Sequence, residues 1–362
     1  MRAFIYPLTP PSPGGRGALV ATATRNNFSI VLQLPPVLHL GFHIMHYPSL
    51  SKKDLDHAVH VLKTGRLVAL PTETVYGLAA DARNEAALKK IFAAKGRPSD
   101  HPLIVHIATI DQLSDWAMTI PAYAHKLAEH FWPGPMTLIL PKQADVLDLV
   151  TGGQTTVGIR IPQHPIAQAV LHAFNGGLAA PSANLFGHIS PTSAQHVKQS
   201  LGEQVDFILD GGPCAVGIES TIIDCTTPQP RILRPGMITK AMIETATQLT
   251  INDEHSCAPR VSGALASHYA PRTPTHLLNT ARLDETLQQT DNSVVLSRRK
   301  PGIRKPGVHW IVMPHDAEAY AHILYEKLHY ADQLQCQQLL IEEVPNDPEW
   351  QGIQDRLRKA SA

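Results

Sequence analysis

A helical period opens the patterned part of the chain. From Ser51 onward, apolar residues recur at the spacing of one helix face, and the stripe ends at Gly65, a residue type that often follows a helix. The apolar positions are Leu55, Ala58, Val59 and Leu62. This spacing predicts an amphipathic helix over residues 51–65.

Short apolar runs then alternate with further helical patterns as far as residue 236. Expected strands lie within 66–82, 102–108, 136–142, 156–162, 177–184, 206–212, 220–226 and 230–236, and expected helices over 85–97, 121–132 and 165–174. The helices are too short and irregular for a barrel, and several Gly/Pro turns permit antiparallel neighbours. We therefore predict an α/β fold, with a twisted mixed parallel and antiparallel sheet flanked by helices.

A smaller α/β pattern follows nearer the carboxy terminus. Expected strands at 275–278, 293–298, 309–314 and 337–345 alternate with helical stretches such as 316–334. Residues 249–273 have little period and are expected to form a linker. The predicted division is an amino-terminal extension at 1–44, a large domain at 45–248, a linker or lid at 249–273, and a small Rossmann-like α/β domain at 274–362.

The first 44 residues differ in composition from the rest. They are rich in Pro, Gly and small polar residues, and we expect a disordered extension outside the fold. A targeting segment would need a compact apolar core and a cleavage-like ending, which are missing. Because Met45 directly precedes the first helical pattern, our hypothesis is that translation starts there. Peptides from upstream of Met45 in the native protein would contradict it.

Composition narrows the class of protein. Lys+Arg and Asp+Glu are equal at 31 each in 362 residues, so the chain offers no overall field for a polyanion and has room for two domains. The cysteines Cys214, Cys225, Cys257 and Cys336 form no CxxC pair, which fits a reducing cytoplasm better than a disulfide framework. No apolar run approaches the roughly 18 residues that would indicate a transmembrane helix.

Polar clusters follow several predicted strands, where α/β folds place binding groups. The first is PTETVYGL at 71–78, in which Thr72 and Thr74 come directly after a buried-looking strand. Their hydroxyls can bind a small polar substrate. Taken alone, however, the simpler interpretation is that they satisfy backbone groups of the turn.

The next cluster is KGRPSDHPLIVHI, which places Lys95 and Arg97 at the end of a predicted helix. Paired cations suit phosphate oxygens, Lys as a point charge and Arg as a fork. Basic residues at a helix C-terminus also complement the helix dipole without any ligand, so both interpretations stay open. His101 and His106 have no third ligand at metal-binding spacing, and we predict no metal site.

The strand TTVGIRIP carries Thr156 and Arg160 four residues apart and therefore on the same face. An arginine inside an apolar strand requires a partner, because an unpaired buried charge is costly. Either a protein carboxylate or an anionic ligand would serve. We favour the ligand, since no acidic residue lies nearby in the sequence.

Later segments add hydroxyls, an amide and another cation. They contain APSANLFGHISPT, GIESTIID and RILRPG, and the candidates are Ser182, Asn184, Ser190, Ser220, Thr221 and Arg234. No GxxxxGK[ST] or GxGxxG string is present, so a bound nucleotide would have to be held by side chains. Hydrolytic and covalent chemistries also lack their usual parts, GxSxG, HExxH or a cysteine beside a base.

The order of these strings resembles a known family. PTETVYGL, KGRPSDHPLIVH, WPGPMTLIL, TVGIRIP, APSANLFGHISPT, GIESTIID and ILRPG together resemble the YrdC-like threonylcarbamoyl-AMP synthases. SHYAP at 267–271, followed by a second α/β domain, resembles the longer two-domain form. The likeness covers residues 51–275 by motif and the remainder by architecture, and it implies the YrdC-like sheet.

The resemblance implies a nucleotidyltransferase, an L-threonylcarbamoyladenylate synthase. L-Threonine would capture bicarbonate as a carbamate on its amine, and a carbamate oxygen would attack the α-phosphorus of ATP and expel pyrophosphate. It also implies Mg²⁺, a cytoplasmic location without membrane contact, and a downstream tRNA threonylcarbamoyl transferase complex that uses the product to make threonylcarbamoyladenosine (t6A) in tRNA. Weak RNA binding is an additional option.

Carried over motif by motif, the resemblance assigns two groups of residues. Around L-threonine it implies Thr74, His106, Arg160, the Ala180 backbone and Ser220, with Arg160 pairing the carboxylate. Around ATP it implies Arg97, His101, Thr156, Ser182, Asn184, Ser190, Arg234 and Tyr269. Lys95 and Arg97 are the expected catalytic residues, which offset charge on the phosphates. Tyr269 is expected to reach back from the linker as part of a lid.

His101 departs from the family pattern, which often has Asn at this place. An imidazole can still donate one hydrogen bond, but its charge can titrate near neutrality. The role of His101 is therefore expected to differ from that of an amide.

Two other functions are weighed against this one. A non-catalytic double-stranded RNA-binding module would use a concave basic surface, but zero net charge argues against it, and the basic run 298–305 is more typical of a solvated loop. A carbamoyl-phosphate-handling enzyme of hydrogenase maturation shares the YrdC-like domain. It normally also carries zinc-finger and acylphosphatase-like segments, which this sequence lacks.

Overall fold

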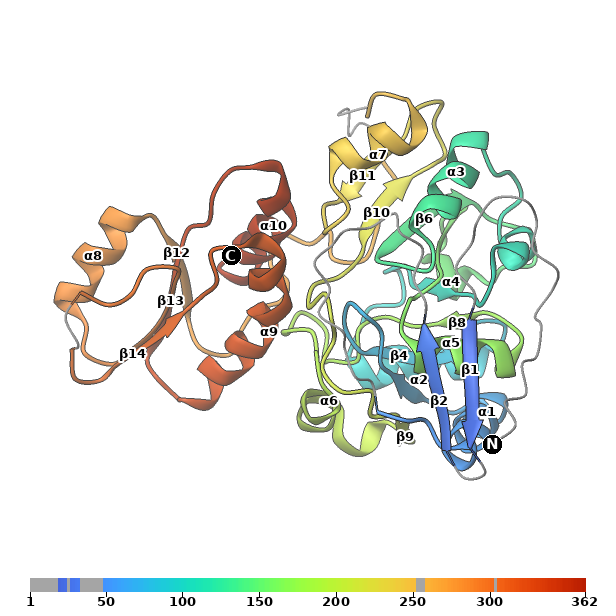
Figure 1. Ribbon diagram of the computed structural model, residues 1–362, viewed down its shortest axis with the longest axis horizontal. Coiled ribbons are helices and arrows are strands. Elements are labelled where there is room, and N and C mark those ends of the chain that lie inside the picture. The colour runs from blue at the N-terminus through green and yellow to red at the C-terminus, as the bar shows by residue number, and fades with distance from the viewer. Residues whose placement is uncertain (1–18, 25–26, 33–47, 252–257, 303–304) are drawn as a thin grey trace.

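A computed structural model describes residues 19–24, 27–32, 48–251, 258–302 and 305–362. Its helices and strands form a large unit on a nine-stranded sheet and a small unit on a four-stranded sheet, which lie side by side in Figure 1. This arrangement confirms the expected α/β class and the second, smaller α/β unit.

The amino-terminal stretch contains a strand pair that the sequence pattern did not predict. β1 (Leu19–Thr24) and β2 (Asn27–Leu32) pair antiparallel with each other and, among the described strands, with no other. The expectation of no strand before residue 45 is therefore corrected. The stretch is rich in Pro, Gly and small polar residues, a composition that indicated disorder, and a lone two-stranded sheet is marginal in water. Met45, the hypothetical start, lies outside the described residues.

The nine-stranded sheet is mixed, as expected. Its order is β11-β10-β6-β7-β5-β8-β4-β3-β9, in which β10/β6, β7/β5 and β3/β9 are parallel and the other neighbours antiparallel. The strands are β3 (Val68–Leu70), β4 (Gly77–Asp81), β5 (Ile104–His106), β6 (Met136–Pro141), β7 (Thr156–Arg160), β8 (Leu178–Ala179), β9 (Phe207–Ile208), β10 (Thr221–Asp224) and β11 (Arg231–Arg234).

Helices cover both faces of this sheet. Val68 and Leu70 of β3 point into a core shared with α1 and α5, whereas Ala69 points into the core beneath α2 and α3. Because both faces are buried, the strands read as continuous apolar runs. The helices of the large unit are α1 (Lys52–Lys63), α2 (Glu85–Lys95), α3 (Ala122–Phe131), α4 (Asp148–Thr151), α5 (Pro165–Phe174), α6 (Ala194–Leu201) and α7 (Lys240–Thr247), with 3-10 turns at Ile110–Asp115 and Gly202–Gln204.

Local signals explain the helix ends near the site. The Ser51 hydroxyl accepts a hydrogen bond from the Asp54 backbone and caps α1. Helix α2 ends at Gly96, whose φ of 60° is favoured by glycine, and the chain there turns toward Arg97. Helix α1 ends at Lys63, with Thr64 as C-cap and Gly65 next at a φ of 69°, so both helices end close to the predicted glycines.

The small unit has an all-parallel sheet in the order β12-β15-β13-β14. Helices α9 and α10 pack on the face toward the large unit, and α8 packs on the opposite face (Figure 1). The elements are β12 (Thr275–Leu278), α8 (Thr280–Gln289), β13 (Ser293–Ser297), β14 (Val308–Val312), α9 (Ala317–Gln333), β15 (Gln338–Glu342), a 3-10 turn at Pro348–Trp350, and α10 (Gln351–Ala360). No helix in the described residues is long and apolar enough to cross a membrane.

The segment between the units is irregular. Residues 258–274 contain no helix or strand apart from one isolated bridge between His188 and Ala270. Tyr269 within it has a φ of 62°, a left-handed conformation that is uncommon for a bulky residue and needs support from its surroundings. The domain limits at 45, 249 and 274 remain predictions.

Candidate active site

Strand ends of the large unit and the irregular segment 258–274 converge on one cavity. Its volume is about 50 Å³. The lining residues come from the loop after β3, the end of α2, the strands β5 and β7, the loop after β8, the ends of β10 and β11, and the irregular segment. They are Thr72, Thr74, Val75, Gly77, Arg97, Ile104, His106, Arg160, Ala180, Pro181, Ser182, Glu219, Ser220, Arg234, Ser262, Gly263, His268 and Tyr269.

Arg160 anchors one end of the cavity. Its guanidinium donates to Glu73 Oε1 at 2.6 Å, to Thr74 Oγ1 at 2.9 Å and to the Gly134 carbonyl at 3.2 Å. Glu73 is 1 % exposed and also accepts from the backbone N–H of Gln163. A protein carboxylate, the less favoured of the two expected partners, therefore pairs with Arg160. Arg160 also lines the cavity, and its pairing with an anionic ligand stays a prediction. Glu73 lies 87 positions from Arg160 in the sequence, so proximity along the chain could not reveal the pair.

His106 lies beside Arg160 because β5 and β7 are parallel and the two residues are register partners. Burial, followed by the charge of Arg160, lowers the pKa of His106 to about 3. The imidazole is therefore neutral at pH 7 and can accept a hydrogen bond as well as donate one. Across the cavity, Ser220 Oγ lies 2.8 Å from Thr137 Oγ1.

Arg234, at the end of β11, holds Ser220 and the irregular segment together. Its Nε and Nη2 donate to the Ser220 carbonyl at 3.1 and 2.9 Å, and its Nη1 donates to the Ser262 carbonyl at 3.0 Å. Arg234 is buried, and its guanidinium forms part of the cavity lining. A cation in this position can neutralise an anionic ligand while keeping the segment in place.

Arg97 brings a second cation from the end of α2. Its Nη2 donates to the Pro102 carbonyl at 2.9 Å and to Ser262 Oγ at 3.2 Å, while Nε has no hydrogen-bond partner among the described residues. Burial lowers its pKa to about 10, and the group stays charged at neutral pH. A buried N–H without a partner is costly, and an anion in the cavity would remove that cost.

His268 and Tyr269 close the cavity from the side of the irregular segment. Both are buried, and the His268 Nδ1 and the Tyr269 hydroxyl have no hydrogen-bond partner among the described residues. Gly263 allows this packing, because a Cβ there would lie 2.2 Å from the Tyr269 hydroxyl. Together with Arg97, these atoms leave three unsatisfied polar positions around one small space.

The residues implied around threonine all line the cavity. Of the residues implied around ATP or as catalytic, only some line it. Arg97, Ser182, Arg234 and Tyr269 line it, whereas Lys95, His101, Thr156, Asn184 and Ser190 do not. Thr156 lines an adjoining pocket that shares Ile104 and Ser262 with the cavity. His101 packs edge-on against Phe186, and burial together with the charge of Arg97 lowers its pKa, which favours the neutral imidazole.

Lys95 does not line the cavity, and its side chain contacts the loop after β8. It is 2 % exposed, and its Nζ donates to the carbonyls of Ser182 and Asn184, both at 2.5 Å. In the same loop the Asn184 amide donates to the carbonyls of Leu185 and His188. Lys95 and Asn184 therefore shape the loop that presents Ser182. The catalytic role predicted for Lys95 stays a prediction.

Sequence reasoning missed several residues of the site. Glu73 and Glu219 are carboxylates within the quoted strings, but each is recognisable only through its arginine partner, Arg160 or Arg356. Ser262 and Gly263 belong to a stretch without period and left no sequence signal. His268 stands beside Tyr269 in the string SHYAP, which was the available clue.

The arrangement is suited to binding anions. Arg97, Arg160 and Arg234 face one cavity together with hydroxyl groups, while the carboxylates Glu73 and Glu219 are paired with arginines. The described residues contain no group of three or more His, Cys, Asp or Glu side chains placed to hold a metal ion. Such a site can position phosphates and carboxylates and offset their charge.

Buried neutral histidines predict a pH dependence of stability. Burial lowers the pKa of His106 and His268 to about 3 and that of His164 and His196 to about 4, from 6.5. The unfolded chain binds these protons below pH 6.5 and the folded chain does not, so the free energy of unfolding falls as the pH is lowered. We expect a loss of about 1.4 kcal/mol per pH unit for each histidine protonated only when unfolded.

Denaturant unfolding at intervals from pH 7 to 5 measures this slope above the range where carboxylates titrate. Replacing His106 with glutamine should reduce the slope by the contribution of one histidine, about 1.4 kcal/mol per pH unit. A free energy of unfolding that stays constant from pH 6.5 to 5 would contradict the prediction.

Comparisons with known proteins agree with this fold. A family model described as Telomere recombination matches residues 60–236, and one described as Threonylcarbamoyl-AMP synthase, C-terminal domain, matches residues 238–362. The chain is 38% identical over 327 residues to the Threonylcarbamoyl-AMP synthase of Bacillus subtilis, covering 86% of this chain and 94% of that protein. It is 37% identical over 316 residues to that of Pyrococcus abyssi, covering 84% and 93%.

Solved structures give the same result. The crystal structure of P. abyssi Sua5 complexed with L-threonine superposes with a TM-score of 0.78 at 36% identity, covering 86% of this chain and 95% of that one. A structure of a double alanine variant of P. abyssi Sua5 gives 0.78 at 34% identity, covering 85% and 93%. Fold and cavity define a two-unit α/β protein with an anion-binding site. The chain belongs to the threonylcarbamoyl-AMP synthase family.

Proposed function

We propose that this chain converts L-threonine, bicarbonate and ATP to L-threonylcarbamoyl-AMP and pyrophosphate. The observation that carries the proposal is the single cavity in which Arg97, Arg160 and Arg234 face the hydroxyls of Thr74 and Ser220. Three cations suit a carboxylate at one end and a polyphosphate at the other. Membership of the threonylcarbamoyl-AMP synthase family supports the choice of substrates.

L-Threonine is assigned to the end of the cavity with Arg160. Its carboxylate would accept from the Arg160 guanidinium, which Glu73 and Thr74 hold in place. His106, the Ala180 backbone and Ser220 lie around the same space and can accept or donate to the amine and the hydroxyl. One relative of known structure binds L-threonine, in agreement with this assignment.

ATP is assigned to the end with Arg97 and Arg234. Ser182 lies beside them on the loop that Lys95 braces, and Thr156 is in the adjoining pocket. Mg²⁺ would arrive bound to the phosphates as part of the substrate. The described residues provide no cluster of metal ligands, so no protein group is assigned to it.

The irregular segment is assigned the role of a lid. A cavity of about 50 Å³ is far smaller than the roughly 300–1,000 Å³ typical of small-molecule sites. Ser262, Gly263, His268 and Tyr269 occupy part of its wall, so ATP would enter only after this segment moves away. Closure would then exclude water from the reactive product.

The proposed chemistry needs position and charge compensation more than a protein nucleophile. The threonine nitrogen forms a bond to the bicarbonate carbon and water leaves, which gives a carbamate. A carbamate oxygen then forms a bond to the α-phosphorus, the bond from phosphorus to the β-bridging oxygen breaks, and pyrophosphate leaves. Arg97 and Arg234 would offset the negative charge that develops on the phosphate oxygens.

Pyrophosphate release tests the proposal directly. The full chain is incubated with ATP, Mg²⁺ and bicarbonate, and L-threonine is compared with L-serine and with no amino acid. We expect release that requires both threonine and bicarbonate, with serine a poorer substrate because it lacks the methyl group. Amino-acid-independent release, or none from folded protein that binds ATP, would contradict the proposal.

The double-stranded RNA-binding alternative is not favoured. In the basic run 298–305, Arg298 lies over the Trp350 ring, Arg299 pairs with Asp284, and the Lys305 ammonium donates to backbone carbonyls. Cations engaged in this way are poor counterions for phosphates. We place the reaction in the cytoplasm and its product with a downstream tRNA threonylcarbamoyl transferase complex.

A further inference from the structure

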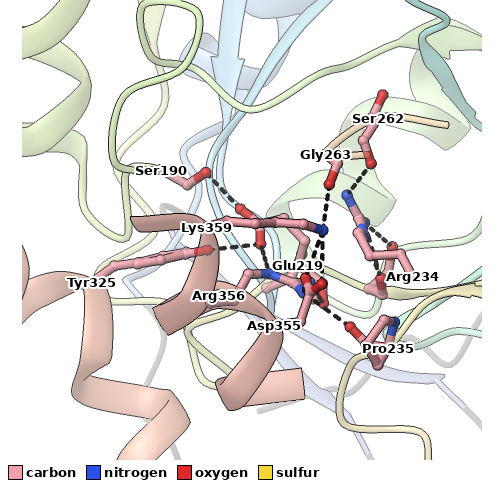
Figure 2. A network of polar contacts seen from close by, with 12 residues as sticks. Ser190, Glu219, Arg234, Pro235, Ser262, Gly263, Tyr325, Asp355, Arg356 and Lys359 are labelled. Atoms are coloured by element: carbon pink, nitrogen blue, oxygen red, sulfur yellow. Dashed lines mark hydrogen bonds and ion pairs between the residues drawn. The ribbon is translucent and has the colours of Figure 1, made fainter. Parts of the chain in front are cut away.

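Helix α10 of the small unit turns one face toward the residues that form and flank the cavity wall. Gly352, Arg356 and Lys359 are spaced by four and three residues and therefore share that face. Gly352 packs so closely that a Cβ there would lie 3.0 Å from the backbone of Gly236, just after β11. Beyond this contact the Arg356 side chain reaches the large unit, and the Lys359 side chain reaches the irregular segment (Figure 2).

Arg356 is fully engaged. It is 1 % exposed, its Nε donates to Glu219 Oε2 at 2.7 Å, and its Nη2 donates to the Glu219 carbonyl at 3.3 Å. Its Nη1 donates to the Pro235 carbonyl at 3.0 Å and to Asp355 Oδ2 at 2.7 Å. A buried arginine with this many partners is fixed in orientation, and it fixes the groups that it contacts.

The partners of Arg356 directly flank two residues of the cavity wall. Glu219 precedes Ser220, and Pro235 follows Arg234. Arg234 itself donates to the Ser220 carbonyl and hydroxyl. One side chain of the small unit therefore holds, through neighbouring backbone, both the hydroxyl assigned to threonine and the cation assigned to ATP.

Glu219 explains why a cation is needed at this position. It lines the cavity, and a carboxylate there would repel phosphates unless its charge were compensated. Tyr325 of α9 donates to Glu219 Oε2 at 2.9 Å and Ser190 donates to Oε1 at 2.5 Å, in addition to Arg356. Burial alone would raise the pKa of Glu219, but Arg356, Arg234 and the Ser190 hydroxyl together lower it to about 2.

The same helix face also contacts the segment that closes the cavity. The Lys359 ammonium donates to the Gly263 carbonyl at 2.7 Å and pairs with Asp355. The Arg356 guanidinium lies 5.2 Å from the centre of the Tyr269 ring, a cation–π contact. Helix α10 thus touches the strand ends and the irregular segment at once, as Figure 2 shows for Arg356, Lys359, Pro235 and Gly263.

We propose that Arg356 is a positioning residue for the reaction. Through Glu219 and Pro235 it aligns Ser220 and Arg234 for ATP and threonine, so that the small unit completes an active site whose walls lie in the large unit. This inference rests on the proposed function. Its physical basis is that charge-assisted hydrogen bonds between buried groups fix one geometry. Without them, flexible loops would sample many geometries.

The test compares Arg356→Ala, Arg356→Lys and Tyr325→Phe in the full chain with Leu283→Ala as a control. Leu283 is buried against the far face of the small sheet, in a core that contains none of these residues. Kinetics of pyrophosphate release separate KM for ATP, KM for threonine and kcat. Calorimetric titration with a non-hydrolysable ATP analogue and thermal unfolding accompany each variant.

For Arg356→Ala we expect the KM for ATP and the dissociation constant of the analogue to rise about tenfold or more, as for lost charge-assisted hydrogen bonds. Arg356→Lys should lie between it and wild type, because it keeps the charge and loses the fork. Tyr325→Phe keeps the ring and should show a smaller rise of about fivefold. Leu283→Ala should lower the Tm without changing either constant.

The outcomes separate this inference from the proposed function. If Arg356→Ala does not fold, Arg356→Lys and Tyr325→Phe show whether Arg356 positions the site or only stabilises the fold. Wild-type KM values and analogue affinity in these variants, with a lowered Tm like that of Leu283→Ala, would show that Arg356 only stabilises the fold. Wild-type protein without threonine-dependent release would overturn the proposed reaction, while the analogue titration would still decide whether Arg356 positions the nucleotide end.

Discussion

Replacing Arg160 with alanine should raise the threonine concentration required for half-maximal pyrophosphate release by about 100-fold or more, as for truncation of one partner of a buried charge pair. The KM for ATP should change much less, because Arg97 and Arg234 lie at the other end of the assigned site. Pyrophosphate release measured against threonine at saturating ATP, and against ATP at saturating threonine, gives both values.

The pairing of Arg160 with Glu73 calls for a second variant. Alanine at Arg160 leaves a carboxylate that is 1 % exposed without its cation, which is expected to lower the free energy of unfolding by about 3–5 kcal/mol. Arg160→Lys keeps a cation in place and loses the forked geometry, so it should fold better and still show a raised KM for threonine. Equal losses for threonine and ATP in both variants would mean that Arg160 is structural.

For ATP the largest effect is expected from Arg97→Ala. This change removes a cation whose Nε has no partner among the described residues, and the KM for ATP should rise about 10- to 100-fold, as for lost hydrogen bonds to a charged group. Its partners are the Pro102 carbonyl and the Ser262 hydroxyl, so no buried carboxylate is left unpaired and the chain should fold. Analogue titration and pyrophosphate kinetics measure the effect.

Arg83→Ala is the matched control for that variant. Both arginines lie over an aromatic ring, Arg97 over Phe186 and Arg83 over Trp116. Arg83 pairs with Asp145 and does not line the cavity. An exposed ion pair is worth about 0–1 kcal/mol, so stability and the KM for ATP should both stay near wild type. The assignment of Arg97 would be wrong if both variants bound the ATP analogue equally well.

Two buried carboxylates of the site are each paired with an arginine. Glu73 fixes Arg160 at the end assigned to threonine, and Arg356 fixes Glu219 near the end assigned to the nucleotide. A buried ion pair is weak evidence for stability, because the cost of desolvating two charges offsets their attraction. Its value at these positions is orientation, since each cation and carboxylate is held against several partners at once.

Local signals in the sequence were sufficient for most of the elements. The helix over 51–65 and the strands at 275–278 and 293–298 followed from apolar period and from glycine at the helix end, because these depend on neighbours along the chain. The first strand pair, Leu19–Thr24 with Asn27–Leu32, was not predicted, because the stretch around it is rich in Pro, Gly and small polar residues and indicated disorder. Strands buried on both faces could be placed in the fold but not ordered within the sheet.

The sequence by itself also indicated one group of neighbours, because Thr74, His106, Arg160, Ala180 and Ser220, which the resemblance grouped together, all line one cavity. Only the tertiary structure decided that Glu73 pairs with Arg160, that Lys95 donates to a loop carbonyl, and that Arg356 of the other unit contacts Glu219 of the cavity wall. Motifs record residue types at fixed local spacing. Buried charges find partners through space, and their separation along the chain places no limit on that choice.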